Sequence, residues 1–203
     1  MDADAVEIRV LGCLIEKQRT TPDTYPLTLN SLRLACNQAT NRDPVVDYDE
    51  GTIRDALQRL WRKEWARLAS GQGSRSVKYR QLVQETLGLA GDEISILCVL
   101  MLRGPQTPGE LKQRTDRLHA FAGLAEVEET LERLIARELA VRLERRPGQK
   151  EERYAQLLGG ELEEPGERDA PRPVLARDPL EERVAALEEE VAALRAALTD
   201  LGL

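Results

Sequence analysis

The chain has 203 residues, of which 41% are hydrophobic, 32% are charged and only 3% are aromatic. This composition indicates a globular protein with an aliphatic core, and it disfavours a surface on which single-stranded bases would stack. The net charge of −7 is unevenly distributed: residues 1–84 carry +2, residues 85–159 carry −2, and residues 160–203 carry −7.

The apolar runs and the cysteines bear on further classes of protein, namely membrane proteins and metal-binding proteins. No apolar run approaches the roughly 20 residues that span a bilayer, and the acidic N-terminus lacks the basic region of a signal peptide, so we expect a cytoplasmic protein with no membrane partner. Cys13, Cys36 and Cys98 lie far apart, and His119 is the single histidine. We therefore expect buried, reduced thiols, with no metal site and no cofactor.

The first part of the chain contains short apolar segments at helical spacing, separated by proline- and glycine-containing stretches. Asp49 can cap one helix, in which we expect Leu57, Leu60 and Trp61 to be buried. Residues 71–75 then provide the turn of a hairpin. In chain order we expect helices over residues 4–18, 28–39 and 49–64, and hairpin strands over residues 66–68 and 77–80.

The chain then repeats this pattern, which indicates a duplicated domain. Residues 7–11 match 93–97, residues 53–60 match 127–134, and residues 78–83 match 153–158. The offset is 86 residues at the first block and 74 at the second, so the first copy holds 12 additional residues between them. We place this insertion around residues 20–47.

In the second copy, Thr107 and Glu110 have the spacing of a capping box at the start of a helix. We expect the other helices over residues 92–103 and 125–138, and a hairpin that turns through residues 147–148. Three helices followed by a hairpin is the order of a winged helix-turn-helix. The sequence therefore predicts an α+β, mostly α, fold with two tandem winged helix-turn-helix domains and a C-terminal coiled-coil helix.

We place the first winged-helix domain at residues 1–84, the second at 85–159, a flexible acidic linker at 160–178, and the coiled-coil helix at 179–203. The last segment has a strict heptad pattern, which is typical of a parallel two-stranded coil. Its candidate dimerisation residues are Leu180, Val184, Leu187, Val191, Leu194, Leu198 and Leu201. The alternative is a terminal helix that docks on its own chain, because about three heptads are marginal alone.

The third helix of a winged helix can enter the major groove of DNA while the wing contacts phosphate. In the first copy the candidate DNA-binding residues are Arg54, Gln58, Arg59, Arg62, Lys63, Arg67, Arg75, Lys78 and Arg80. The alternative is a solvated face, because Glu50, Asp55 and Glu64 leave this helix with no net charge. The equivalent helix of the second copy is acidic and would repel phosphate.

Two other segments have polar side chains that could take part in a site. Residues 37–44 gather amides and an arginine, which could contact phosphate or a peptide backbone, or bond their own turn. His119 beside Phe121 has no companion that would make it a base or a ligand. We find no phosphate-binding glycine loop and no nucleophile at catalytic spacing, so we expect no catalytic residues and no enzyme.

Several short motifs within residues 5–160 resemble one known family. They include residues 14–17 (LIEK), 20–23 (TTPD), 35–38 (ACNQ), 73–75 (GSR), 102–111 (LRGPQTPGEL) and 153–154 (RY). In these motifs the chain resembles the YceH-like family of bacterial proteins. The resemblance implies a tandem winged-helix fold and no established biochemical role. Ala39 stands where such proteins often have lysine, which weakens a phosphate-binding role for this loop.

Two functions agree with these observations. The first is a homodimeric, non-enzymatic protein that binds duplex DNA, with a regulatory role in transcription, through the third helix and wing of the first copy. The second is a protein-interaction adaptor, in which the winged-helix surfaces bind another protein within a larger complex. The basic first copy favours DNA. The acidic second copy and acidic tail favour a protein partner.

Overall fold

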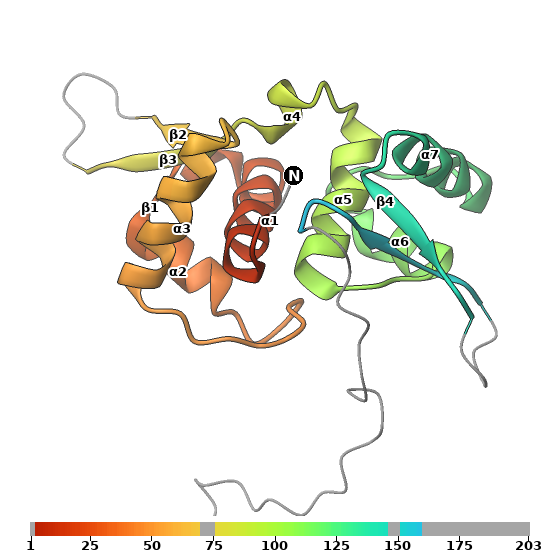
Figure 1. Ribbon diagram of the computed structural model, residues 1–203, viewed down its shortest axis with the longest axis horizontal. Helices are drawn as coiled ribbons and strands as arrows, with labels where there is room; N and C mark the ends of the chain where they lie inside the picture. Colours follow the sequence, from red (N-terminus) through yellow and green to blue (C-terminus); the bar gives the residue numbers. More distant parts are fainter. Residues whose placement is uncertain (1–2, 70–75, 146–150, 160–203) are drawn as a thin grey trace, which may run out of the picture. The chain divides into compact units, whose positions relative to one another are not determined.

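The computed structural model describes residues 3–69, 76–145 and 151–159. In this part of the chain the fold is mostly helical with two small antiparallel sheets, which confirms the predicted α+β, mostly α, class (Figure 1). The described residues belong to one compact unit that ends at Leu162. The predicted linker and heptad segment lie outside the described residues, as do Arg75 and the turn at residues 147–148.

The first half contains three helices followed by a hairpin, in the predicted order. Its elements are α1 (Ala5–Thr20), the 3-10 helix η1 (Pro22–Thr24), β1 (Leu27–Thr28), α2 (Leu29–Cys36), α3 (Glu50–Arg62), β2 (Ala66–Leu68) and β3 (Lys78–Gln81). The strands form an antiparallel sheet of order β1-β3-β2, in which Tyr79 of β3 pairs with Leu27 on one side and with Leu68 on the other.

The second half repeats this order after a short connecting helix. Its elements are α4 (Val83–Thr86), α5 (Gly91–Arg103), α6 (Pro108–Thr115), α7 (Leu124–Ala136), β4 (Ala140–Leu143) and β5 (Arg153–Gln156). β4 and β5 pair antiparallel, and Gln106 forms an isolated bridge with Tyr154, at the position that β1 occupies in the first half.

Helix caps recur at matching positions of the two halves. Glu7 accepts a hydrogen bond from the Asp4 amide at 3.0 Å, and Glu93 accepts one from the Ala90 amide at 2.8 Å, 86 residues further on. The predicted Thr107 capping box at the start of α6 is confirmed. Asp49 caps α3 as predicted, through the Thr52 amide at 2.7 Å.

The caps of α2 and α6 also locate the insertion. Thr28 and Thr107 each accept a hydrogen bond from the third residue of the helix that follows, so they are equivalent caps. They are 79 residues apart, whereas equivalent residues are 86 apart at α1 and 74 apart at α3. The additional residues of the first half are therefore divided by α2. Some form η1 before it, and the others lie in the segment of residues 37–49 after it.

Helices α3 and α7 end in the same way. Glu64 and Glu138 have φ values of 59° and 55°, in the left-handed region that side chains other than glycine rarely adopt. In each half the next residue, Trp65 or Leu139, donates its amide back to the helix at 2.9 Å and is buried. The left-handed residue thus turns the chain from the third helix into the first long strand of the hairpin.

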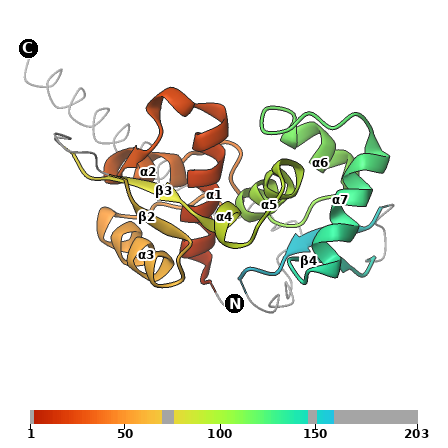
Figure 2. The ribbon, with the colours of Figure 1, turned by 90° about the horizontal axis from the view of Figure 1, so that it is seen from above.

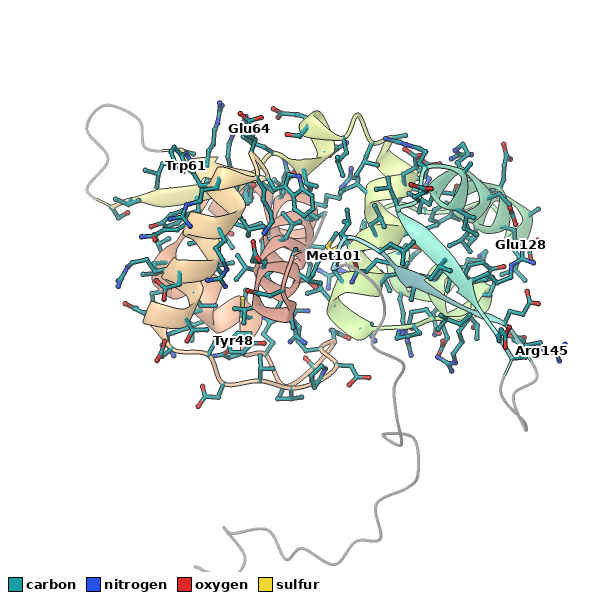
Figure 3. The ribbon with its side chains drawn as sticks, in the orientation of Figure 1. Tyr48, Trp61, Glu64, Met101, Glu128 and Arg145 are labelled. Atoms are coloured by element: carbon teal, nitrogen blue, oxygen red, sulfur yellow. The ribbon has the colours of Figure 1, made fainter. Side chains whose placement is uncertain are left out.

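Helices α1 and α5 join the halves. Each is buried over most of its length on every side, as expected for a helix with packing partners all round. Gly12 and Cys98 occupy equivalent positions, and the Cys98 thiol lies 3.4 Å from the Gly12 carbonyl. Met101 lies between the two helices (Figure 3). Both views place α5 between α1 on one side and α6 and α7 on the other (Figures 1 and 2).

The structure also corrects several details. Trp61 was predicted to be buried, but its side chain is 64% exposed. It lies seven residues after Arg54 and therefore on the same side of the helix, whereas the buried stripe follows Ile53 and Leu60. Helix α2 ends at Cys36 rather than near Ala39.

Three other findings concern the described residues. All three cysteines are free and buried, as predicted. No described helix is long and apolar enough to cross a membrane. Within the same residues, no group of three histidine, cysteine or acidic side chains is arranged to hold a metal ion.

Candidate nucleic-acid interface

The exposed side of α3 has three polar side chains in line. Arg54, Gln58 and Arg62 follow one another at intervals of four residues, so they occupy one face of the helix. All three are exposed, and the part of the chain that the structure describes provides no ion pair or hydrogen bond to their side chains. These side chains are therefore free to contact a ligand. Glu50 extends the same stripe at its N-terminal end.

Arg59 and Lys63, on the neighbouring face of α3, already have partners. Lys63 lies 2.6 Å from a carboxylate oxygen of Glu7, and Arg59 lies 2.8 Å from Asp4 and 3.5 Å from Glu7. The Glu7 side chain is only 2% exposed, so these two cations neutralise a buried charge. Both residues were candidates for DNA contact, and their ion pairs give them a structural role.

The same connection exists in the second half. There Glu93 is the buried carboxylate, and the cations of α7 that approach it are Arg133 at 3.8 Å and Arg137 at 3.1 Å. Arg133 and Arg137 are the repeat equivalents of Arg59 and Lys63, at the offset of 74 residues. The outer face of the second half is not basic, yet this half has the same ion pair. We infer that the ion pair supports the fold of each half.

The outer face of the β1-β3-β2 sheet is cationic in the first half. Arg67 of β2 pairs with Arg80 of β3, and Lys78 lies two residues from Arg80 and so on the same face. Like charges directly opposite each other are unfavourable without a counterion. Arg80 has one at 3.3 Å, the exposed Glu85, whereas Arg67 and Lys78 have no ion pair with a described residue.

The equivalent surfaces of the second half differ in charge. Glu128 and Glu132 replace Arg54 and Gln58 on α7, and Glu132 pairs with Arg142 of β4 at 2.6 Å. Figure 3 shows Glu128 on α7, in the half that does not contain α3. On the sheet, the paired residues Val141 and Ala155 are the repeat equivalents of Arg67 and Arg80.

An exposed apolar group near α3 was missed by the sequence interpretation. Trp61 at the end of α3 is 64% exposed, and Leu68 and Val77 of the adjacent hairpin region are 58% and 51% exposed. Figure 3 places Trp61 beside the β2–β3 hairpin. The seven-residue spacing from Arg54 is a sequence signal that Trp61 is exposed, but a tryptophan in an amphipathic helix is usually counted toward the core.

Residues 37–44 form hydrogen bonds within their own turn, as one of the alternatives expects, and also to residues outside it; within the turn, Arg42 donates to Gln38 at 2.9 Å. The Asn37 amide donates to the Tyr48 carbonyl at 2.8 Å and accepts from the Tyr48 amide at 2.9 Å. The Arg42 guanidinium is buried and binds both oxygens of Glu16, at 2.6 and 3.1 Å. These bonds hold the segment after α2 against α1.

Asp49 and His119 are two further ionisable residues with defined contacts. The Asp49 carboxylate accepts hydrogen bonds from Thr52, which lower its pKa below the ordinary value and keep a negative charge at the N-terminus of α3. His119 is half-buried, with its ring edge-on to Phe121 at 4.6 Å and its Nε2 atom 3.8 Å from Glu126. This environment gives the histidine a structural setting.

Comparisons with known proteins agree on one group of relatives. A family described as "Protein of unknown function, DUF480" matches residues 3–149. A UPF0502 protein of Pelobacter propionicus is 50% identical over 194 residues, which cover 93% of this chain and 88% of that relative. The UPF0502 protein YceH of Salmonella paratyphi B is 45% identical over 204 residues, covering 97% and 94%. The predicted resemblance to YceH-like proteins is thus confirmed, and none of these names assigns an activity.

Proposed function

The chain belongs to the DUF480 family of proteins of unknown function, and we propose that it is a non-enzymatic DNA-binding protein that regulates transcription. Its two halves would be tandem winged-helix domains, with α3 as the helix that enters the major groove. The proposal depends mainly on one observation: Arg54, Gln58 and Arg62 are exposed on a single face of α3 without an intramolecular partner among the described residues.

The chemistry of this face suits a DNA duplex. Arginine can bind guanine edges with two hydrogen bonds, and glutamine can bind adenine in the same manner. Arg67 and Lys78 on the outer face of the hairpin sheet would contact phosphate, which would also relieve the opposition of Arg67 and Arg80. Arg59 and Lys63 are left out of this interface, since they neutralise Glu7.

The test is binding of mixed duplex DNA to the full chain at two salt concentrations. The variant Arg54→Ala/Arg62→Ala should bind at least tenfold more weakly, because each bidentate contact to a base edge contributes about 1–3 kcal/mol. The affinity of the unmodified chain should fall as salt rises, because Arg67 and Lys78 would contact phosphate and each phosphate contact adds about 0.9 to the slope of log K against log salt. Fluorescence anisotropy of labelled DNA measures both quantities.

A matched control distinguishes the effect of this face of α3 on DNA affinity from the effect of net charge. Lys112→Ala/Arg142→Ala also removes two cations, from α6 and β4 of the second half. It should retain most of the affinity of the unmodified chain. Equal losses for the two double variants, or binding that ignores salt, would contradict the proposal.

The exposed Trp61 favours a second candidate, the protein-interaction adaptor. Aromatic side chains are enriched where protein partners bind, and Leu68 and Val77 add apolar surface near it. For this candidate, Trp61→Ala should abolish binding of a purified partner identified by cross-linking in the native host, while DNA affinity stays unchanged. Retained partner binding by Trp61→Ala would reject this surface.

A further inference from the structure

A cavity of about 620 Å³ lies at the junction of the two halves. Its walls come from the C-terminal end of α1, the segment after α2, α5 and α6. This volume is within the range of small-molecule sites, which is roughly 300 to 1,000 Å³. None of the described residues that line it belongs to α3 or to the β2–β3 hairpin, so it is separate from the proposed DNA surface.

Cations predominate on the walls of this cavity. Lys17, Arg103, Arg114 and Arg117 line it, from α1, α5, α6 and the residues just after α6. Among the described lining residues, Glu16 is the only carboxylate. The cavity therefore has a strongly positive wall built from both halves of the repeat.

The single carboxylate is already neutralised. Glu16 is bound by both Nη atoms of the buried Arg42 and lies 3.3 Å from Lys17. Burial raises the pKa of Glu16, but the hydrogen bonds and charge of Arg42 outweigh it and leave that pKa below its ordinary value. Because Arg42 supplies a full countercharge, Glu16 does not offset the other cations of the wall.

The arginines of the wall are incompletely compensated. Burial and the charges of Arg114 and Arg42 lower the pKa of Arg103, as expected where cations are crowded. Arg114 lies 3.4 Å from Glu110, which also binds Arg153 at 3.1 Å. Arg117 is exposed and has no ion pair with a described residue.

The remaining lining is partly apolar. Val99 and Leu102 of α5 and Leu118 contribute apolar side chains, and Gln38 and Thr40 contribute polar ones. Arginine binds phosphate and carboxylate groups through paired N–H donors. An apolar patch beside several such donors suits a ligand that has both anionic groups and a hydrocarbon or ring portion.

We propose that this cavity binds a small organic polyanion, with its anionic groups on Arg103, Arg114 and Arg117 and its uncharged portion against Val99 and Leu102. The inference goes beyond the proposed DNA-binding function and does not depend on it. The chemistry admits phosphate and carboxylate groups, which the test distinguishes with separate probes.

Isothermal titration of the full chain, without DNA and at constant ionic strength, tests the site with ADP, citrate and adenosine. We expect saturable binding of ADP or of citrate at millimolar or lower concentration, and none of adenosine, which lacks the anionic groups. Binding of ADP alone would identify phosphate as the preferred group, and binding of citrate alone would identify carboxylate.

Variants at the wall complete the test. Arg117→Gln removes an exposed cation that has no ion pair with a described residue, so it should leave the fold intact and weaken binding about tenfold, the effect of losing one charge-assisted hydrogen bond. Arg114→Gln should weaken binding similarly. Arg142→Gln, on β4 and outside the cavity lining, should leave it unchanged.

Two results would overturn the proposal. One is the failure of both ADP and citrate to bind at millimolar concentration. The other is equal weakening by Arg142→Gln and Arg117→Gln, which would show that only the net charge matters. Neither result affects the DNA assay, because the cavity variants leave the exposed face of α3 unchanged.

Discussion

Gly12 lies where α1 packs directly against α5. A Cβ atom added at this position would lie 2.9 Å from Cδ2 and 3.0 Å from Cγ of Leu102, and 3.1 Å from Cβ of Met101. Such distances are shorter than ordinary van der Waals contact, so the glycine permits the two halves to pack. Cys98, its repeat equivalent, fills the opposite side of the same contact.

We expect Gly12→Val to lower the free energy of unfolding by about 2 kcal/mol, because added methyl groups would force α1 away from α5. Urea denaturation followed by circular dichroism measures the change. Gly109→Val, at an exposed position in α6 where an added Cβ meets only the Thr107 hydroxyl at 3.9 Å, is the matched control and should change stability little. Similar losses for both variants would contradict the packing argument.

The cations of α3 are of two kinds, those paired with Glu7 and those on the exposed face, and their substitution should affect the free energy of unfolding differently. Arg59→Ala/Lys63→Ala leaves Glu7 buried without a cation, and we expect a loss of about 1–2 kcal/mol in the free energy of unfolding. Arg54→Ala/Arg62→Ala should unfold at the same denaturant concentration as the unmodified chain, since these side chains have no partner among the described residues. An unstable Arg54→Ala/Arg62→Ala variant would show that the outer face of α3 also supports the fold.

At the scale of elements, local signals explain what the sequence predicts well. The caps at Asp49 and Thr107 precede α3 and α6 as expected, because a cap depends on residues three positions apart. Helix α4 was not predicted, since it has four residues and no side-chain cap. The exposure of Trp61 was missed although its spacing from Arg54 places it on the polar side of α3, because a large apolar residue beside Leu60 is usually counted toward the core.

The cavity and the ion pairs of Glu7 could not be predicted, for a different reason. Lys17 and Arg103 are 86 residues apart in the chain and come together only because α1 packs on α5. Arg59 and Lys63 look identical in sequence to the free cations beside them, and only their position on the helix turns them toward α1. Sites that form only when distant segments pack together cannot be recognised from local patterns in a single sequence.

The pair of Glu16 and Arg42 connects α1 to the segment after α2, and it should make stability depend on pH. Because the folded-state pKa of Glu16 is lower than its ordinary value, ionisation favours the folded state. This contribution is fully present above the unfolded pKa of about 4.3 and is lost as the pH falls through the folded-state value.

We therefore expect Glu16→Gln to destabilise the chain by about 2 kcal/mol at pH 7 and by less at pH 3, because pH 3 lies below the unfolded pKa and ionisation of Glu16 there favours the folded state by a smaller amount. Denaturation midpoints at the two pH values measure the difference. Glu50→Gln, an exposed substitution at the start of α3, is the control and should have a small effect throughout. A loss for Glu16→Gln that is equally large at both pH values would contradict the electrostatic explanation.

At the scale of the whole molecule, the duplication has preserved the fold and changed the surfaces. The buried carboxylates, the caps and the left-handed glutamates recur in both halves, whereas the outer faces of α3 and α7 have opposite charge. One chain would thus offer a single cationic helix face to DNA. A DNA-binding protein gains affinity and specificity when two such helices act together, as in dimers that bind paired half-sites.

We propose that the heptad residues from Leu180 to Leu201, which lie outside the described residues, pair two chains, because their sequence pattern is typical of a parallel coiled coil. We expect deletion of residues 179–203 to halve the mass in solution, measured by light scattering, and to weaken binding to DNA with two half-sites more than to DNA with one. Leu187→Lys, at a seam position, should have the same effect, while Glu189→Lys, two residues further on the outer side of the heptad, should not. An unchanged mass after deletion would show that this segment is not the dimerisation element. A halved mass with unchanged DNA affinity would instead show that one α3 is sufficient, since coupling between two helices can contribute only when both reach the same duplex.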